Sequence, residues 1–225
     1  MTFNGVRERY EHNEVYLSGV VAFTPEDSER VFGEEMLPIR LDVLRLSGEV
    51  DEIPVYVPIK LIATTPGLSL HGGDFVSVHG QLQTLRAENG KHFAKVVAEA
   101  IVNRTEACGF INRVRLTGEV CGQVDSYDTN LTNRRLTKLP LAAPYSSVSY
   151  GGTAHVSTLF WGTAALETAL CKQGDVVSVC GRLQSRRKTL SPENGGGECV
   201  CVELSVGSFT PLSKTIGCGK GIFGR

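Results

Sequence analysis

A stretch of fourteen residues that occurs twice decides the fold of this chain. It reads "GDFVSVHGQLQTLR" at residues 73–86 and "GDVVSVCGRLQSRR" at residues 174–187, which is 101 residues later. Apolar side chains recur at every second position, a period that predicts a β-strand with one buried face. The residues predicted to be buried are Val76, Val78 and Leu82 in the first stretch and Val177, Val179 and Leu183 in the second.

Three further blocks are duplicated in the same order, which indicates two copies of one domain. They are "NEVYLSGVV" (13–21) with "NRVRLTGEV" (112–120), "PVYVPI" (54–59) with "HVSTLF" (155–160), and "VAEAIV" (97–102) with "CVELSV" (201–206). A repeat of this length indicates tandem globular domains rather than a solenoid of short units. We predict copy one at residues 10–106, copy two at residues 109–209, and a basic, mobile tail at residues 210–225.

The order of elements within each copy predicts the fold class. Each copy is predicted to contain five short strands, and one short segment lies between the third strand and the repeated stretch. In copy two this segment (162–174) suits a helix of two to three turns, whereas Pro66 and Gly67 predict a shorter or distorted helix in copy one. Glycines inside the strands, at 19, 80, 118 and 181, predict bulges or bends where a barrel closes. We therefore expect a mainly all-β chain of two tandem OB-folds, each a five-stranded Greek-key barrel with a helix between strands three and four.

The composition excludes several classes of protein. The chain has 225 residues, of which 41% are hydrophobic, so each copy can bury a core. It has no apolar run of membrane-spanning length, and its first residues lack the apolar region of a secretory signal. Seven cysteines without a CxxC pair are typical of reduced thiols, so we expect a cytoplasmic protein. The sequence offers no metal-ligand pattern or catalytic grouping, and we expect no enzyme activity, metal or cofactor.

Charge is distributed unevenly between the two copies. Residues 1–110 hold 10 Lys and Arg against 16 Asp and Glu, whereas residues 111–225 hold 13 against 8, and the whole chain has a net charge of −1. An asymmetry of this kind points to an anionic partner for the basic half. Drift on a solvated surface is the alternative explanation.

The motifs of copy two resemble those of the bacterial single-stranded DNA-binding protein family. The resemblance lies in "NRVRLTGEV" (112–120) followed by "HVSTLFWGTAALETALCKQGDVVSVCGRL" (155–183), while copy one lacks the aromatic-glycine step before its helix. It implies the variant with two OB-folds in one chain, which pairs as a homodimer to give four. The family usually ends in an acidic tail that recruits replication proteins. This chain has no acidic residue after Glu203, so recruitment by such a tail is not expected.

Cationic loops mark the expected DNA-binding side. In OB-folds the loops at one side of the barrel bind oligonucleotides, and a single strand needs a cationic surface with flat side chains. Candidate cations are Arg182, Arg186, Arg187 and Lys188 in the last hairpin of copy two, Arg134, Arg135 and Lys138 in its first loop, and Arg86 and Lys91 in copy one. The first loop of copy one (23–36) is acidic instead. Any one of these cations could equally belong to a solvated loop tip.

Aromatic side chains are the candidate stacking platforms. Trp161 is the one tryptophan, and the resemblance implies that it takes the place of a family aromatic that stacks on a base. Strand alternation sends one of Phe160 and Trp161 inward, and the alternative is that Trp161 packs on the helix as core. Tyr127 in copy two and Tyr56 and Phe93 in copy one are further candidates. Phe75 could stack on a base or lie between the domains.

Together these patterns predict a non-catalytic protein that binds single-stranded DNA, largely without sequence preference, in replication, recombination or repair. Copy two is expected to be the stronger binder. The alternative is an OB-fold interaction module of a replication or conjugation complex with weak or no DNA binding. The outer residues of the first strands, Tyr16, Ser18, Arg113 and Arg115, could form a dimer edge or face solvent.

Overall fold

The computed structural model describes residues 12–31, 33–86, 92–105, 108–129, 134–147, 150–189 and 198–213. Three of the sequence predictions fall outside this part of the chain. They concern Lys91, the side chains of Arg86 and Lys188, and residues 214–225 of the predicted tail.

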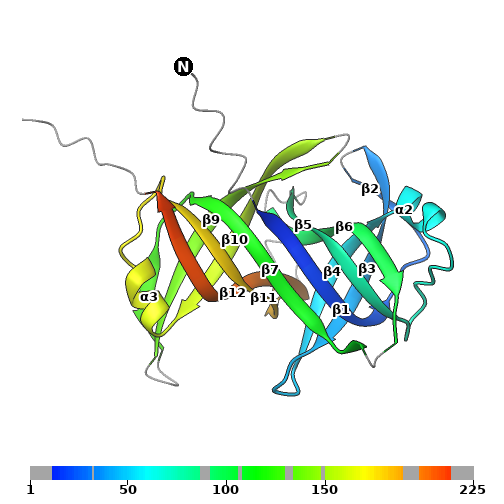
Figure 1. The fold of residues 1–225 in the computed structure, drawn as a ribbon, viewed down its shortest axis with the longest axis horizontal. Helices are drawn as coiled ribbons and strands as arrows, with labels where there is room; N and C mark the ends of the chain where they lie inside the picture. The colour runs from blue at the N-terminus through cyan, green and yellow to red at the C-terminus, as the bar shows by residue number, and fades with distance from the viewer. Residues whose placement is uncertain are drawn as a thin grey trace, which may run out of the picture.

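The described residues of each copy form the same series of strands, interrupted by one short helix that lies at the outer end of its barrel (Figure 1). Copy one contains β1 (Asn13–Phe23), β2 (Glu29–Val31), β3 (Glu34–Leu44), β4 (Val50–Pro58), α2 (Ile59–Thr64), β5 (Phe75–Arg86) and β6 (His92–Asn103). Copy two contains β7 (Ile111–Val120), β8 (Asp125–Asp128), β9 (Arg135–Ser146), β10 (Gly151–Trp161), α3 (Thr163–Thr168), β11 (Val176–Thr189) and β12 (Glu198–Ser213).

Five long strands close into a barrel in each copy. In copy one, β1 pairs with β3 and β5, β3 pairs with β4, β4 runs parallel to β6, and β6 pairs with β5. Copy two has the same circuit through β7, β9, β10, β12 and β11. This is the strand order of an OB-fold, so the predicted fold class is confirmed. The short strands β2 and β8 add to the outer edges of β3 and β9 and were not predicted.

The helices differ from the sequence prediction in two respects. A shorter helix was expected in copy one because of Pro66 and Gly67, yet α2 and α3 are both six residues long. Six residues are fewer than two turns, so α3 is also shorter than the two to three turns predicted. The proline does not shorten α2, because the helix starts directly after β4 and has already ended before residue 66.

The core fills the inside of each barrel with the residues that strand alternation selected. Val76, Val78 and Leu82 are at most 3% exposed, and Val177, Val179 and Leu183 are fully buried. They join one apolar cluster with the inward residues of the first strands, among them Val15, Leu17, Val114 and Leu116. Period two therefore identified the buried face correctly in both copies.

Glycines at equivalent places let β5 and β11 bend around the barrel. The register shifts between His79 and Gly80 and again between Cys180 and Gly181. A Cβ at Gly80 would lie 2.1 Å from the carbonyl oxygen of Val97, so only glycine fits this close approach. The sequence prediction of a bend at these glycines is confirmed.

Two asparagines hold the strands together beyond each bend. The Asn13 side chain donates to the carbonyl of Leu82 and accepts from its N–H, both at 2.8 Å. Asn112 makes the same pair of hydrogen bonds with Leu183, also at 2.8 Å. The asparagine that begins both duplicated first strands thus replaces ladder bonds that the bend removes.

Antiparallel pairing of β1 with β7 joins the two barrels into one sheet. Residues Asn13 to Ser18 pair with Leu116 to Ile111 in reverse order, and β1 and β7 lie side by side at the centre of Figure 1. The sequence left open whether the edge of the first strands forms a dimer contact or faces solvent. In the structure this edge is paired within the chain. Tyr16 lies opposite Arg113, is 42% exposed, and stacks on His79.

The register also corrects the alignment of the two copies. The block at 54–59 was matched to 155–160, an offset of 101. Val55 and Thr158 instead occupy equivalent positions. Each pairs in parallel with a residue of the last strand of its barrel, and these two partners lie at the same distance from the bend. Leu41 and Leu141 are equivalent at an offset of 100, so the β9–β10 hairpin is three residues longer than its counterpart. This longer hairpin reaches over copy one towards β2 (Figure 1).

Neither described helix is both long and apolar enough to cross a lipid bilayer.

Candidate nucleic-acid interface

Two aromatic side chains lie in one row on the outside of copy two. Tyr127 on β8 pairs with Leu136 on β9, which pairs with Trp161 on β10, so all three side chains share a face of the sheet. Trp161 is 40% exposed and Tyr127 is 45% exposed, while Leu136 is buried between them. Two strand spacings separate the rings, roughly 10 Å at the backbone. We call the surface formed by Tyr127, Leu136, Lys138, Leu159 and Trp161 the outer face of copy two.

Strand alternation decides between Phe160 and Trp161 in favour of the tryptophan. Phe160 points inward, is fully buried, and meets Phe209 edge to face with ring centres 5.6 Å apart. Trp161 is the last residue of β10 and points outward, just before Gly162 turns with φ of +61° into α3. The alternative that Trp161 belongs to the core does not hold.

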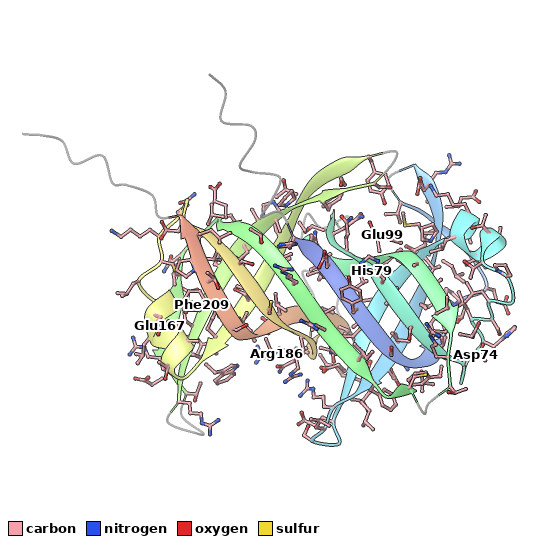
Figure 2. The ribbon with its side chains drawn as sticks, in the orientation of Figure 1. Asp74, His79, Glu99, Glu167, Arg186 and Phe209 are labelled. Atoms are coloured by element: carbon pink, nitrogen blue, oxygen red, sulfur yellow. The ribbon has the colours of Figure 1, made fainter. Side chains whose placement is uncertain are left out.

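Cations accompany the aromatic row. Lys138 is half-buried on the same face, two residues after Leu136 on β9. It pairs with Leu159 on β10 and with Asp125 on β8. The same side of the sheet continues from β10 over β12 to β11, where Arg186 lies. Arg186 is exposed at the lower centre of the molecule, 4.0 Å from the carboxylate of Glu203 (Figure 2).

Arg134 and Arg135 do not join this row. Arg134 is exposed at the end of the first loop of copy two. Arg135 points to the other side of β9, where its Nε donates to the Ser126 hydroxyl at 3.0 Å and its guanidinium lies 3.9 Å from Asp128. Arg135 therefore braces β8 against β9.

The other two arginines of the last hairpin contact copy one rather than solvent alone. Arg182 lies 3.2 Å from Asp51, and Arg187 lies 2.5 Å from Glu52. Asp51 and Glu52 are at the start of β4, directly after the turn of the β3–β4 hairpin. Part of the excess positive charge of copy two is therefore paired with carboxylates of copy one in the same chain.

Asp51 is the centre of this contact between the copies. Its side chain is fully buried and accepts hydrogen bonds from Arg45, from Arg182 and, at 2.9 Å, from the backbone N–H of Ser185. The Ser185 hydroxyl in turn accepts from the N–H of Glu52 at 3.0 Å. The hydrogen bond to Asp51 is the main reason why the pKa of Arg45 is raised. A carboxylate buried in this way is stabilised by its paired cations and would be costly without them.

The corresponding face of copy one is covered. Tyr56, a predicted stacking platform, is 3% exposed and packs with Met36 and Val97 under Val31 and Tyr150. This corrects the prediction, because a buried ring offers no surface to a base. The reason is tertiary, since Tyr150 belongs to the β9–β10 hairpin of copy two.

Polar neighbours fix Tyr56 further. Its hydroxyl donates to Glu29 at 3.3 Å, and the Lys95 ammonium lies 4.4 Å from the ring centre. Burial, reinforced by the Glu29 carboxylate, raises the pKa of Tyr56 to about 12. Burial also lowers the pKa of Lys95.

The remaining aromatic candidates of copy one lie apart. Phe93 is half-buried on β6, two residues before Lys95. Phe75 is buried and meets Phe110 edge to face, with ring centres 5.3 Å apart. Because Phe110 directly precedes β7, the first strand of copy two, Phe75 takes the domain-contact role that the sequence left open.

Sequence reasoning missed the carboxylates that face the basic hairpin. The "GEVDE" stretch at 48–52 showed the acidic charge, but its partners are more than 130 residues away in the chain. In the described part of the chain, no three His, Cys, Asp or Glu side chains gather in a way that could hold a metal ion.

Comparison with solved structures identifies the architecture. The wild-type single-stranded DNA binding protein of Thermus aquaticus aligns with a TM-score of 0.64 at 21% identity, over 90% of this chain and 93% of its own. A deletion variant of that protein aligns with a TM-score of 0.65 at 20% identity, over 92% and 98%. Both barrels are OB-folds. The N-terminal domain of PriB from Thermoanaerobacter tencongensis covers 42% of this chain and 98% of its own, at 32% identity and a TM-score of 0.36. No family model and no curated protein sequence matches the chain.

Proposed function

We propose that this chain binds single-stranded DNA without catalysing a reaction and largely without sequence preference, through the outer face of copy two. One observation carries the proposal. Tyr127 and Trp161 are exposed in one row across β8, β9 and β10, with Lys138 beside them. The likeness to the Thermus aquaticus protein over both barrels supports it, because that protein is a single-stranded DNA binding protein.

The chemistry of this face suits a flexible, unpaired strand. Bases stack on the flat faces of Trp161 and Tyr127, and each stacked base contributes about 1–3 kcal/mol regardless of its identity. Lys138 and Arg186 attract the phosphates, with Arg134 at the loop end. Because phosphate contacts release counterions, the affinity falls as the salt concentration rises.

The cellular setting follows from the resemblance in the sequence together with the shared fold. We infer a member of the bacterial single-stranded DNA-binding protein family that acts in the cytoplasm in replication, recombination or repair. We also infer a homodimer with four OB-folds. Its two chains would meet through the sheet face that carries Tyr16, because the edges of β1 and β7 are already paired with each other.

A binding assay with two single variants tests the proposal. Fluorescence anisotropy of labelled oligo-dT should show salt-sensitive binding by the unaltered chain. Trp161→Ala should weaken binding by about 5–150-fold, which is the loss of one stacked base. Lys138→Ala should weaken it and reduce the dependence of log affinity on log salt by about 0.7, the value for one phosphate of a single strand. Binding that neither variant changes would contradict the proposal.

A second candidate function rests on a different observation. Arg182 and Arg187, two of the predicted DNA-binding cations, are already paired with Asp51 and Glu52. An OB-fold interaction module of a replication or conjugation complex would need no more than this architecture. Absence of oligo-dT binding, together with a stable protein complex in a pull-down from the source cell, would favour it.

A further inference from the structure

We propose that each chain holds DNA on copy two alone, and that the equivalent face of copy one is closed by the chain's own residues. The inference rests on the proposed function and goes further, because duplication of a DNA-binding barrel would by itself suggest two equivalent sites. It predicts one strand of DNA for every pair of barrels.

The strand register shows what copy one carries in place of the binding residues. Met36 and Leu136 are equivalent, since each lies five residues before an equivalent leucine. The row that reads Tyr127, Leu136, Trp161 in copy two reads Glu29, Met36, Pro58 in copy one. Pro38 occupies the place of Lys138.

These replacements remove each kind of DNA contact in turn. Proline at 58 and glutamate at 29 have no aromatic face on which a base can stack. Proline at 38 has no charge to attract a phosphate, and the Glu29 carboxylate repels one. The exposed groups that support binding on copy two are therefore missing from copy one at the same three positions.

Tyr56, the aromatic residue that copy one carries on this face, is buried. Met36, Tyr56 and Val97 are between 0% and 4% exposed, and Tyr150 of copy two packs against them. The β9–β10 hairpin that brings Tyr150 is the one that is three residues longer than its counterpart. Tyr56 therefore presents no exposed ring face to a base.

The cavity beside the buried Tyr56 cluster is also unsuited to a phosphate chain. It has a volume of about 760 Å³ and lies between copy one and the β9–β10 hairpin, with Glu34 and Glu99 in its wall. The one lysine of the wall, Lys60, is paired with Glu34 at 2.5 Å. Two carboxylates against one paired lysine repel a phosphate.

A stoichiometry measurement with a short strand tests the inference. Eight-residue oligo-dT is within the range of about 4–16 nucleotides that one OB-fold covers. Titration at low salt, followed by calorimetry, should saturate at one oligonucleotide per chain. Two per chain would overturn the inference and leave the proposed function intact. No binding at all would overturn the proposed function, and the inference with it.

Location is tested separately by hydrogen exchange and by a matched pair of variants. Saturating oligo-dT should slow amide exchange on β8 and at the ends of β9 and β10 that carry Leu136 and Trp161, and should leave β2 to β4 unchanged. Trp161→Ala should lower the affinity at least fivefold, whereas Phe93→Ala, the half-buried aromatic of copy one, should change it less than twofold. Urea unfolding midpoints establish that both variants are folded, and Trp161→Phe, which keeps a flat ring, should retain most of the affinity. Protection on β3 and β4, or a fivefold loss in Phe93→Ala, would contradict the assignment.

Discussion

The Arg182 guanidinium of copy two lies 3.2 Å from the carboxylate of Asp51 in copy one. The equivalent residue of copy one is Gln81, and it also reaches across, since its side chain exchanges two hydrogen bonds of 3.1 Å with the backbone of Ser146. The same position in the duplicated strand therefore joins the barrels twice. Arg182, which distinguishes the second copy of that strand from the first, contributes to assembly of the molecule.

Removing the Asp51 carboxylate should destabilise the chain strongly. Asp51→Ala leaves Arg45 without its buried partner, and breaking a buried ion pair in this way costs about 3–5 kcal/mol. Urea unfolding followed by circular dichroism measures the difference. Glu49→Gln is the matched control, because Glu49 pairs with the same arginine at the surface and should cost at most about 1 kcal/mol. Equal effects of the two variants would contradict the central place of Asp51.

Neutralising Glu52 should strengthen DNA binding. Glu52 pairs with Arg187, so Glu52→Gln removes a carboxylate that competes with phosphate for this cation, and a surface pair is worth about 0.2–1 kcal/mol, which corresponds to an affinity gain of up to about fivefold. Anisotropy titration at low salt measures it. Glu26→Gln removes the same charge from the first loop of copy one and should have a smaller effect. An unchanged or reduced affinity in Glu52→Gln would show that the pair does not compete with DNA.

A methyl group at Gly181 should strain the bend of β11. Its Cβ would lie 2.2 Å from the carbonyl oxygen of Ser205, and overpacking of this kind costs about 1–3 kcal/mol or more. At Gly207 the nearest such contact is an ordinary 3.8 Å, so Gly207→Ala is the control. Thermal unfolding should separate the two variants clearly. Equal midpoints would contradict the account of the bend.

Tyr56 should make stability fall at alkaline pH. Its pKa is raised to about 12 by burial and by Glu29, so the folded state resists its ionisation. A raised pKa contributes stability that is fully present below the ordinary value of 10 and is lost as the pH rises towards 12. Tyr56→Phe removes this contribution, so its free energy of unfolding should fall less steeply between pH 10 and 12. A parallel pH dependence of the two proteins would contradict the burial of Tyr56.

The fold could be predicted because its signals are local. Alternation in "VSVHGQL" and "VSVCGRL" depends on neighbouring residues, and the close backbone contact at each bend explains why glycine stands there. The offset of the block at 54–59 was wrong by two, because the β9–β10 hairpin contains three additional residues whose place the repeat alone does not show.

The site was predicted less completely because burial depends on how the barrels meet. Strand alternation predicted that one of Phe160 and Trp161 points outward but did not show which. The structure shows that it is Trp161. Tyr56 is as aromatic as Trp161, yet it is buried in a cluster against which Tyr150, 94 residues later in the chain, packs. Arg182 and Arg187 were expected to face the ligand, yet Asp51 and Glu52 hold them.

The most direct test of the account is the intrinsic fluorescence of Trp161 during titration with oligo-dT. Trp161 is the only tryptophan in the chain, so the signal reports this one position. We expect saturable quenching at low salt that shifts to higher DNA concentration as salt is added. Unchanged fluorescence, together with no salt-sensitive binding at low salt, would contradict the claim that copy two binds single-stranded DNA.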